Sequence, residues 1–216
     1  MATDPKKTLD AYQAKRGVIR LVEVPPLQYL MVDGTGDPNT AQAYQDAVTA
    51  LFPLAYTLKF ASREKLGIDT VVMPLEGLWH APDMESFTSQ RDKSAWLWTL
   101  MIMVPDHVTP EMFADAVASV ETKAVKKKEQ PSPALPSVRL ETLAEGLSVQ
   151  TLHVGPFDDE GPVLDDLHHR FIPENGLEMT GLHHEIYLSD MRRVEPSKLR
   201  TILRQPVARI DGSAGE

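Results

Sequence analysis

The segment GLHHEIYLSD, residues 181–190, lies between turn-forming residues and contains both a β-branched and an aromatic side chain. It is too short for a helix of ordinary length, so it predicts a β-strand. Side chains alternate between the two faces of a strand. One face is then polar and ionisable (His183, Glu185, Tyr187 and Ser189), and the other is mostly apolar (His184, Ile186 and Leu188). A carboxylate between an imidazole and a phenol can bind a cation or transfer a proton.

The composition sets limits on the class of protein. The chain has 216 residues, enough for one large domain or two small ones, and a net charge of −9 that argues against a nucleic-acid partner. It contains no cysteine, so disulfides, thiolate catalysis and cysteine metal sites are excluded. We find no signal peptide and no apolar run long enough for a membrane span, and we therefore expect a soluble, cytoplasmic protein.

Two halves of the chain show the same order of expected elements. In the first half, strands are expected at 18–24, 27–33, 69–75, 76–80 and 96–104, with helices over about 40–57 and from 109 to about 126. Asn39 or Thr40 is expected to cap the first helix. In the second half, strands are expected at 138–143, 147–154, 181–190 and 199–207, with a helix that ends at Asn175-Gly176.

This repetition predicts an α+β fold. Duplicated strand-helix-strand-strand repeats would form one antiparallel-rich sheet about a pseudo-twofold axis, with helices on one face. We assign residues 17–130, with an extra helix, to the first repeat, 131–137 to a linker and 138–208 to the second repeat. Residues 1–16 are expected to form a tail or a short helix, and residues 209–216 a disordered tail. The repeats would form one ligand-binding domain with a groove at their junction, and residues 81–95 are a candidate lid.

Several motifs resemble the GyrI-like small-molecule-binding family, over roughly residues 17–207. They are the turn Tyr29…Gly34-x-Gly36 and the segments YTLK (56–59), PLEGLW (74–79), WLWTLMI (96–102) and GLHHEIYLSD (181–190). The family includes gyrase inhibitors, ligand-sensing domains of multidrug-responsive transcription regulators, and stand-alone enzymes that hydrolyse the cyclopropane of DNA-alkylating natural products. The stand-alone branch, with its Trp-rich first repeat, is the most similar. Only about 17 residues precede the first expected strand, so we expect no helix-turn-helix and no transcription regulator.

The resemblance implies a groove in which a buried glutamate lies among aromatic side chains, and Glu185 matches that position. We predict Glu185 and Tyr187 as catalytic residues. The predicted ligand-binding residues are Glu76, Trp79, Trp96, Trp98, Tyr56 and His183. An ionised carboxylate in such surroundings is costly unless it is paired, so either its pKa rises or it attracts a cation. No cofactor is implied. No metal site is expected either, because the paired histidines 168–169 and 183–184 diverge from each other.

Each candidate also has a purely structural interpretation. Glu185 could pair with a surface arginine such as Arg192 or Arg193, and His183 could be a rim residue. Trp96 and Trp98 form a stripe that is typical of a core strand. Glu76 and Trp79 would face opposite sides of a regular strand unless Gly77 marks a bulge. The sequence Asp158-Asp159-Glu160 is typical of favourable negative charge at a helix N-terminus, which needs no substrate.

Two hypotheses of function follow. The first is a stand-alone small-molecule-binding protein that hydrolyses the strained ring of hydrophobic, electrophilic toxins, and so acts in detoxification. The second is a module that sequesters or senses hydrophobic cationic aromatic compounds without turnover. A protein-binding role like that of gyrase inhibitors is less well supported, because no extended docking surface is apparent. The sequence leaves the turnover and the oligomeric state open.

Overall fold

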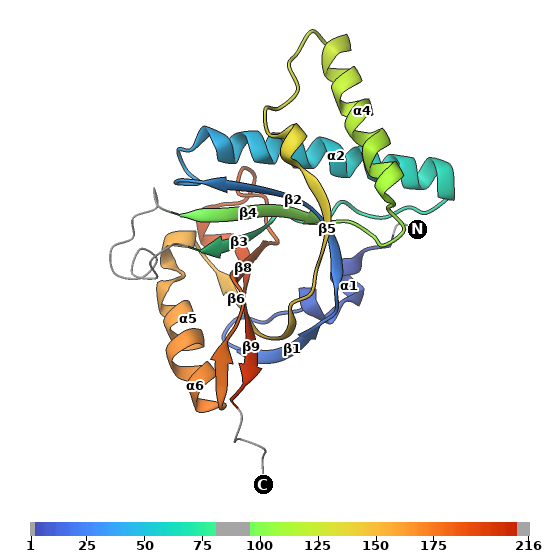
Figure 1. Cartoon of the computed structure of the whole chain (residues 1–216). Helices are drawn as coiled ribbons and strands as arrows, with labels where there is room; N and C mark the ends of the chain where they lie inside the picture. Colours follow the sequence, from blue (N-terminus) through green and yellow to red (C-terminus); the bar gives the residue numbers. More distant parts are fainter. Residues whose placement is uncertain (1–2, 81–95, 211–216) are drawn as a thin grey trace. The chain divides into compact units, whose positions relative to one another are not determined.

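The computed structural model describes residues 3–80 and 96–210, and it is an α+β protein whose named strands pair antiparallel (Figure 1). The candidate lid, 81–95, lies outside the described residues, as does 211–216 of the expected C-terminal tail. The chain divides into two compact units. Unit 1 comprises Met1–Pro5 and Leu27–Leu143, and unit 2 comprises Lys6–Pro26 and Ala144–Glu216.

Unit 1 contains an antiparallel sheet with the order β5-β2-β4-β3. The strands are β2 (Leu27–Thr35), β3 (Glu76–His80), β4 (Leu97–Met103) and β5 (Arg139–Leu143). The bounds expected for β3 are confirmed. Residues 69–75 are not a strand, because their backbone bonds to the N-terminal segment instead: Thr70 forms an isolated bridge with Thr3, and the amide of Val71 donates to the Thr3 carbonyl at 3.1 Å.

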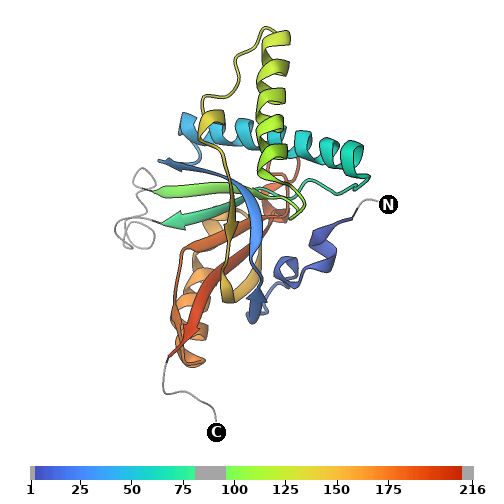
Figure 2. The same cartoon turned by 45° about the vertical axis from the view of Figure 1, so that its right-hand side comes forward.

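Helix α2 (Gln42–Leu66) covers one face of this sheet. Figures 1 and 2 show α2 lying on the sheet, roughly along β2 and β4, and α4 (Pro110–Lys126) crossing α2. The helix α2 buries Leu51, Leu54 and Leu58, and each fully buried leucine contributes on the order of 1.5–3 kcal/mol. It continues past the expected end near residue 57 and stops at Gly67, whose left-handed φ of 70° suits glycine.

The long helices α2 and α4 begin differently. At α4, Thr109 accepts a hydrogen bond from the amide of Met112 at 3.3 Å and proline occupies the first helical position, as expected. At α2 the residue at the cap is Ala41, which provides no side-chain bond, so the expectation of a cap at Asn39 or Thr40 is wrong. The Asn39 side chain and amide are instead bound to the carboxylate of Asp37 in the preceding turn. The short helix η3 (Leu135–Ser137) lies in the proline-rich segment.

Unit 2 repeats the same strand order, as β1-β6-β9-β8. The strands are β1 (Arg20–Val24), β6 (Gly146–Val154), β8 (His183–Tyr187) and β9 (Arg200–Arg209), and β7 (Leu177–Met179) also pairs with β9. The duplication is therefore confirmed, but the first strand of each half pairs with strands of the other half. Strand β1, from the first half, pairs with β6 in unit 2, and β5, from the second half, pairs with β2 in unit 1.

A broken helical segment covers the sheet of unit 2. It consists of η4 (Phe157–Asp159), α5 (Gly161–Asp165), a turn of π-helix η5 (Asp166–Phe171) and α6 (Ile172–Glu174). Leu167 and Ile172 on this segment pack with Val149, Leu177 and Val207 in a buried apolar cluster. The remaining short helices are α1 (Pro5–Thr8), η1 (Asp10–Tyr12) and η6 (Pro196–Lys198).

Candidate functional site

The strand β8 presents its side chains as the alternation predicts. Ile186 and His184 are buried on one face, whereas His183, Glu185 and Tyr187 are partly buried on the other. The ladder with β9 holds this arrangement, because Glu185 is paired with Leu203 and Tyr187 with Thr201. The sequence of β8 thus places a carboxylate between an imidazole and a phenol on one side of the sheet of unit 2.

Glu185 is held by its neighbours on this face. The hydroxyl of Tyr187 donates a hydrogen bond of 2.7 Å to Oε2 of Glu185, and Nε2 of His183 lies 3.6 Å from Oε1. The side chains of His183 and Glu185 are only 13% and 15% exposed. The ring of Phe157 contacts Tyr187 edge to face at 5.5 Å between centroids. Glu185 therefore lies in a largely dry, aromatic setting in which its carboxylate is oriented by a phenol.

Glu185 does not form the surface ion pair with Arg192 or Arg193 that the structural interpretation offered. Arg192 and Arg193 both pair with Asp190, at 3.0 Å and 3.6 Å. These pairs are exposed and contribute little to stability.

Glu160 is a second carboxyl group that acts on Glu185, and the sequence analysis did not predict it as a site residue. It immediately precedes α5, is only 4% exposed, and its Oε1 has no hydrogen-bond partner among the described residues. Burial raises the pKa of Glu160 from 4.5 to about 10, and the charge of Glu185 adds to the rise. The Thr201 hydroxyl lowers the pKa of Glu160 but does not outweigh the effect of burial. Glu160 is thus a neutral acid beside Glu185, and not the solvated helix-end charge that the sequence suggested.

His168 approaches the same cluster from the π-helical turn η5. Its ring contacts that of His183 edge to face, with 5.7 Å between centroids. Burial lowers the pKa of His168 from 6.5 to about 4, with further lowering by His183 and His169, so the ring is neutral near pH 7. Insertion of a π-turn is a recurring feature of functional sites in helices. The π-turn of this protein lies in the same broken helical segment as Glu160.

The opposite face of β8 carries a buried ionic network. Nδ1 of His184 lies 2.9 Å from Oε1 of Glu145, and Nη1 of Arg204 donates to Oε2 of Glu145 at 2.6 Å. Although burial opposes ionisation, His184 and Arg204 together lower the pKa of Glu145 from 4.5 to about 2. Arg204 also donates to Gln150 and to the carbonyl of Ala11. This network joins the N-terminal segment of unit 2 to its sheet and has a structural role.

The predicted tryptophans of unit 1 form a cluster with Tyr44 of α2. Tyr44 of α2 contacts Trp98 edge to face at 5.5 Å and stacks with Trp79 at 6.5 Å, and Trp79 contacts Trp96 at 5.6 Å. Trp98 is fully buried, its indole N–H donates to the carbonyl of Gly36, and its ring fills the space where a Cβ at Gly34 would lie. Trp79 and Trp98 thus fill the interior of unit 1, and contact of these indoles with a ligand stays a prediction.

Glu76 and Tyr56 do not join this cluster. The register of β3 with β4 runs without interruption from Glu76 to His80, so Gly77 marks no bulge and Glu76 faces away from the side of Trp79. Glu76 is completely buried. Tyr56 lies on the outer side of α2, is 49% exposed, and stacks with the exposed Phe60. A ligand-binding role for these two residues also stays a prediction.

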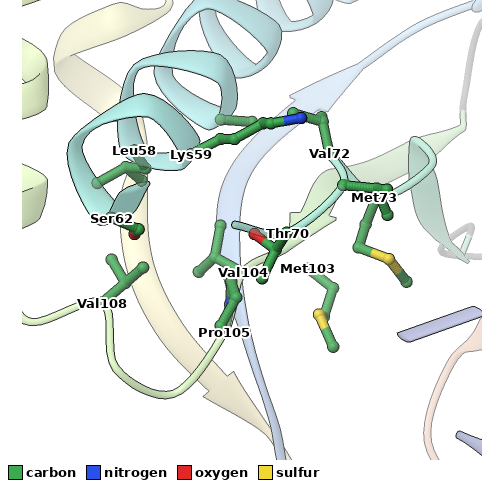
Figure 3. A pocket seen from close by; sticks show the side chains of 12 residues that line it. Leu58, Lys59, Ser62, Thr70, Val72, Met73, Met103, Val104, Pro105 and Val108 are labelled. Atoms are coloured by element: carbon green, nitrogen blue, oxygen red, sulfur yellow. The ribbon is translucent and has the colours of Figure 1, made fainter. Parts of the chain in front are cut away.

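A small cavity lies in unit 1 and a much larger groove in unit 2. In unit 1, Figure 3 shows a cavity of about 10 Å³ between α2 and residues 70–73, which is room for about one water molecule. In unit 2, an open groove of about 820 Å³ is lined by residues 16–19, 151–154 and the segment around α5. Neither Glu185 nor Tyr187 lines this groove.

The described ranges contain neither a cluster of metal ligands nor a membrane-spanning helix. Within residues 3–80 and 96–210, no group of three or more His, Asp or Glu side chains is arranged to hold a metal ion. Across the same ranges, no helix is long and apolar enough to cross a membrane.

Comparison with known proteins places this fold among small-molecule-binding domains. A family model described as the GyrI-like small molecule binding domain matches residues 18–208. The chain belongs to the GyrI-like family. No curated protein matches the chain.

Solved structures give the same fold. The chain is 40% identical to an uncharacterised conserved protein from Listeria innocua, with a TM-score of 0.82 over 95% of this chain and 99% of that one. It is 38% identical to a hydrolase from Listeria innocua, with a TM-score of 0.81 over 96% of this chain and 100% of that one. The C-terminal domain of EcmrR, at 10% identity and a TM-score of 0.53 over 89% of this chain and 98% of that one, shares the fold alone.

Proposed function

We propose that the chain binds a hydrophobic, electrophilic small molecule and hydrolyses a strained ring in it, with Glu185 as general base. The substrate class is a cyclopropane conjugated to a carbonyl, as in DNA-alkylating toxins, and the role is detoxification. Support comes from membership of a small-molecule-binding family and from the relative that is described as a hydrolase. The observation that carries the proposal is the partly buried Glu185, whose carboxylate is oriented by Tyr187 at 2.7 Å.

In this proposal Glu185 removes a proton from water as the water oxygen attacks a ring carbon. Tyr187 fixes the direction of the carboxylate, and His183 lies beside the other carboxylate oxygen at 3.6 Å. Removal of a general base typically slows a reaction by 10²–10⁴-fold, so a loss of about that size is expected in Glu185→Gln. The surrounding Phe157 and Tyr187 rings limit competing water and suit an aromatic substrate.

Sequestration without turnover is the second candidate. A carboxylate next to two aromatic rings also suits a lipophilic cation, which it would hold by charge and by cation–π contact. Because the two candidates share Glu185, binding alone does not separate them.

Product formation separates the two candidates. Purified protein is incubated with a cyclopropane-bearing alkylating agent, and ring-opened product is followed by mass spectrometry. Many turnovers per protein, lost in Glu185→Gln and retained in the exposed-glutamate control Glu178→Gln, would support hydrolysis. Protection that stops at one equivalent, with no product, would support sequestration. Full turnover in Glu185→Gln would remove this residue from the mechanism.

A further inference from the structure

The unused group at this site is Glu160. It is contributed by the turn between η4 and α5, and only 4% of it is exposed. Its carboxyl interacts with the charge of Glu185 on β8 and with the hydroxyl of Thr201 on β9. Its Oε1 is buried and has no hydrogen-bond partner in the described part of the chain. An ionised carboxylate is disfavoured in such a position, because burial removes its hydration and the Thr201 hydroxyl offsets only part of that loss.

The charges around Glu160 all favour its protonated form. Glu185 and Asp158 are the acidic groups that act on it, and both disfavour a further negative charge. Glu185, by contrast, accepts the Tyr187 hydroxyl and has His183 close by. Two neighbouring carboxyl groups with such different surroundings divide the roles of acid and base between them.

We propose that Glu160 is the general acid of this site, the proton donor that complements Glu185. This inference rests on the proposed hydrolysis. Water attacks the ring carbon and gives its proton to Glu185. The broken C–C bond's electron pair moves through the conjugated system to the carbonyl oxygen, which takes the proton of Glu160 and becomes a hydroxyl. Transfer of the proton from Glu185 to Glu160 restores both groups, so the net reaction adds one water.

Tyr187 is a less suitable donor in the same step. Its single hydroxyl proton is already directed to Oε2 of Glu185 at 2.7 Å. Donation to the substrate would break that bond and release the base from its orientation. Tyr187 is therefore a positioning residue in this scheme, whereas Oε1 of Glu160 is buried and bonded to no described neighbour.

Two measurements on the full chain test this assignment. The first is infrared spectroscopy near pH 8, where an ordinary Glu, with a pKa of about 4.3, is ionised. We expect the carbonyl band of a protonated carboxylic acid in the wild-type protein, its loss in Glu160→Gln, and its retention in Glu178→Gln. The second is the steady-state kinetics of ring opening, where we expect kcat in Glu160→Gln to fall by about 10²-fold with little change in KM. The basic limb of the kcat–pH profile should also disappear.

Each outcome has a defined meaning. Absence of the band in the wild-type protein, or its survival in Glu160→Gln, would overturn the assignment. Unchanged kcat in Glu160→Gln would also overturn it, even if the band is lost. If the wild-type protein forms no product, the proposed hydrolysis itself fails and the donor role falls with it. That case differs from failure of the assignment alone, in which product forms at the full rate without Glu160. Circular dichroism confirms that the Gln variant is folded.

Discussion

Because Glu160 is protonated in the folded protein, we predict that stability falls as pH rises through neutrality, and that Glu160→Gln abolishes this dependence. In the unfolded chain this carboxyl ionises with its ordinary pKa of 4.5, whereas in the folded protein its pKa is raised to about 10. Its contribution to stability is therefore fully present below pH 4.5 and is lost as pH rises toward the folded pKa. Near pH 7 the Glu160 carboxyl therefore holds one proton when folded and none when unfolded.

The size of the effect follows from that single proton. A difference of one bound proton changes the free energy of unfolding by about 1.4 kcal/mol per pH unit. Between about pH 6 and pH 8 the wild-type protein should thus lose about 3 kcal/mol that Glu160→Gln does not lose. Titrating groups distant from Glu160 contribute to both proteins alike, so the comparison isolates Glu160 and its acidic neighbours.

Urea denaturation of both proteins at the two pH values measures this difference directly. The stability of Glu160→Gln relative to the wild-type protein should rise with pH, and the exposed control Glu178→Gln should track the wild-type protein throughout. A constant difference between Glu160→Gln and the wild-type protein at both pH values would refute the reasoning, because it would mean that Glu160 is already ionised when folded.

Three further predictions concern packing, the buried ionic network and His168. In Gly34→Ala the new Cβ would lie 2.0 Å from the Trp98 ring, so we expect a loss of about 1–3 kcal/mol, measured as a lower Tm. In Glu145→Gln the fully buried Arg204 loses its charge partner, and we expect urea denaturation to show a loss of about 3–5 kcal/mol near pH 7. The lowered pKa of His168 makes its contribution fully present above pH 6.5 and lost as pH falls toward 4, so His168→Phe should flatten stability between about pH 6.5 and pH 5 in the same assay.

Matched controls make these predictions specific. Gly161→Ala places a methyl group in open space at the start of α5 and should change the Tm little or raise it, unlike Gly34→Ala. Arg192→Gln removes an exposed ion pair with Asp190 and should cost no more than about 1 kcal/mol, unlike Glu145→Gln. His169→Phe changes an exposed imidazole next to His168 and should leave the acidic limb of the stability curve in place. Equal effects of a variant and its control would contradict the structural reason for that variant.

Local patterns in the sequence were sufficient for much of the fold. The alternation in residues 183–187 and the apolar run from Trp96 onward specified strands, because period-two patterning and β-branched or aromatic content act within a few residues. The duplication was also visible as a repeated order of elements. The exchange of first strands was not, since no local signal states whether β1 pairs within its own half or with β6.

In the candidate site, too, the features set by local sequence could be predicted and those set by long-range packing could not. Glu185 and Tyr187 could be placed on one face from strand geometry alone. Glu160 could not be identified, because Asp158-Asp159-Glu160 matches an ordinary helix start and its burial depends on packing against β8 and β9. The π-turn that carries His168 lacks a simple sequence pattern as well.

The exchanged strands have a consequence for how the protein can be divided. A cut within the proline-rich segment near residue 135 would give two fragments, neither of which holds a complete sheet. The N-terminal fragment would carry β1 without β6, and the C-terminal fragment would carry β5 without β2. Each fragment would expose an unpaired strand edge that only its counterpart completes. The chain is thus suited to reconstitution from two separately produced pieces, and an ancestor with a single repeat would have needed a second copy of itself to close its sheet.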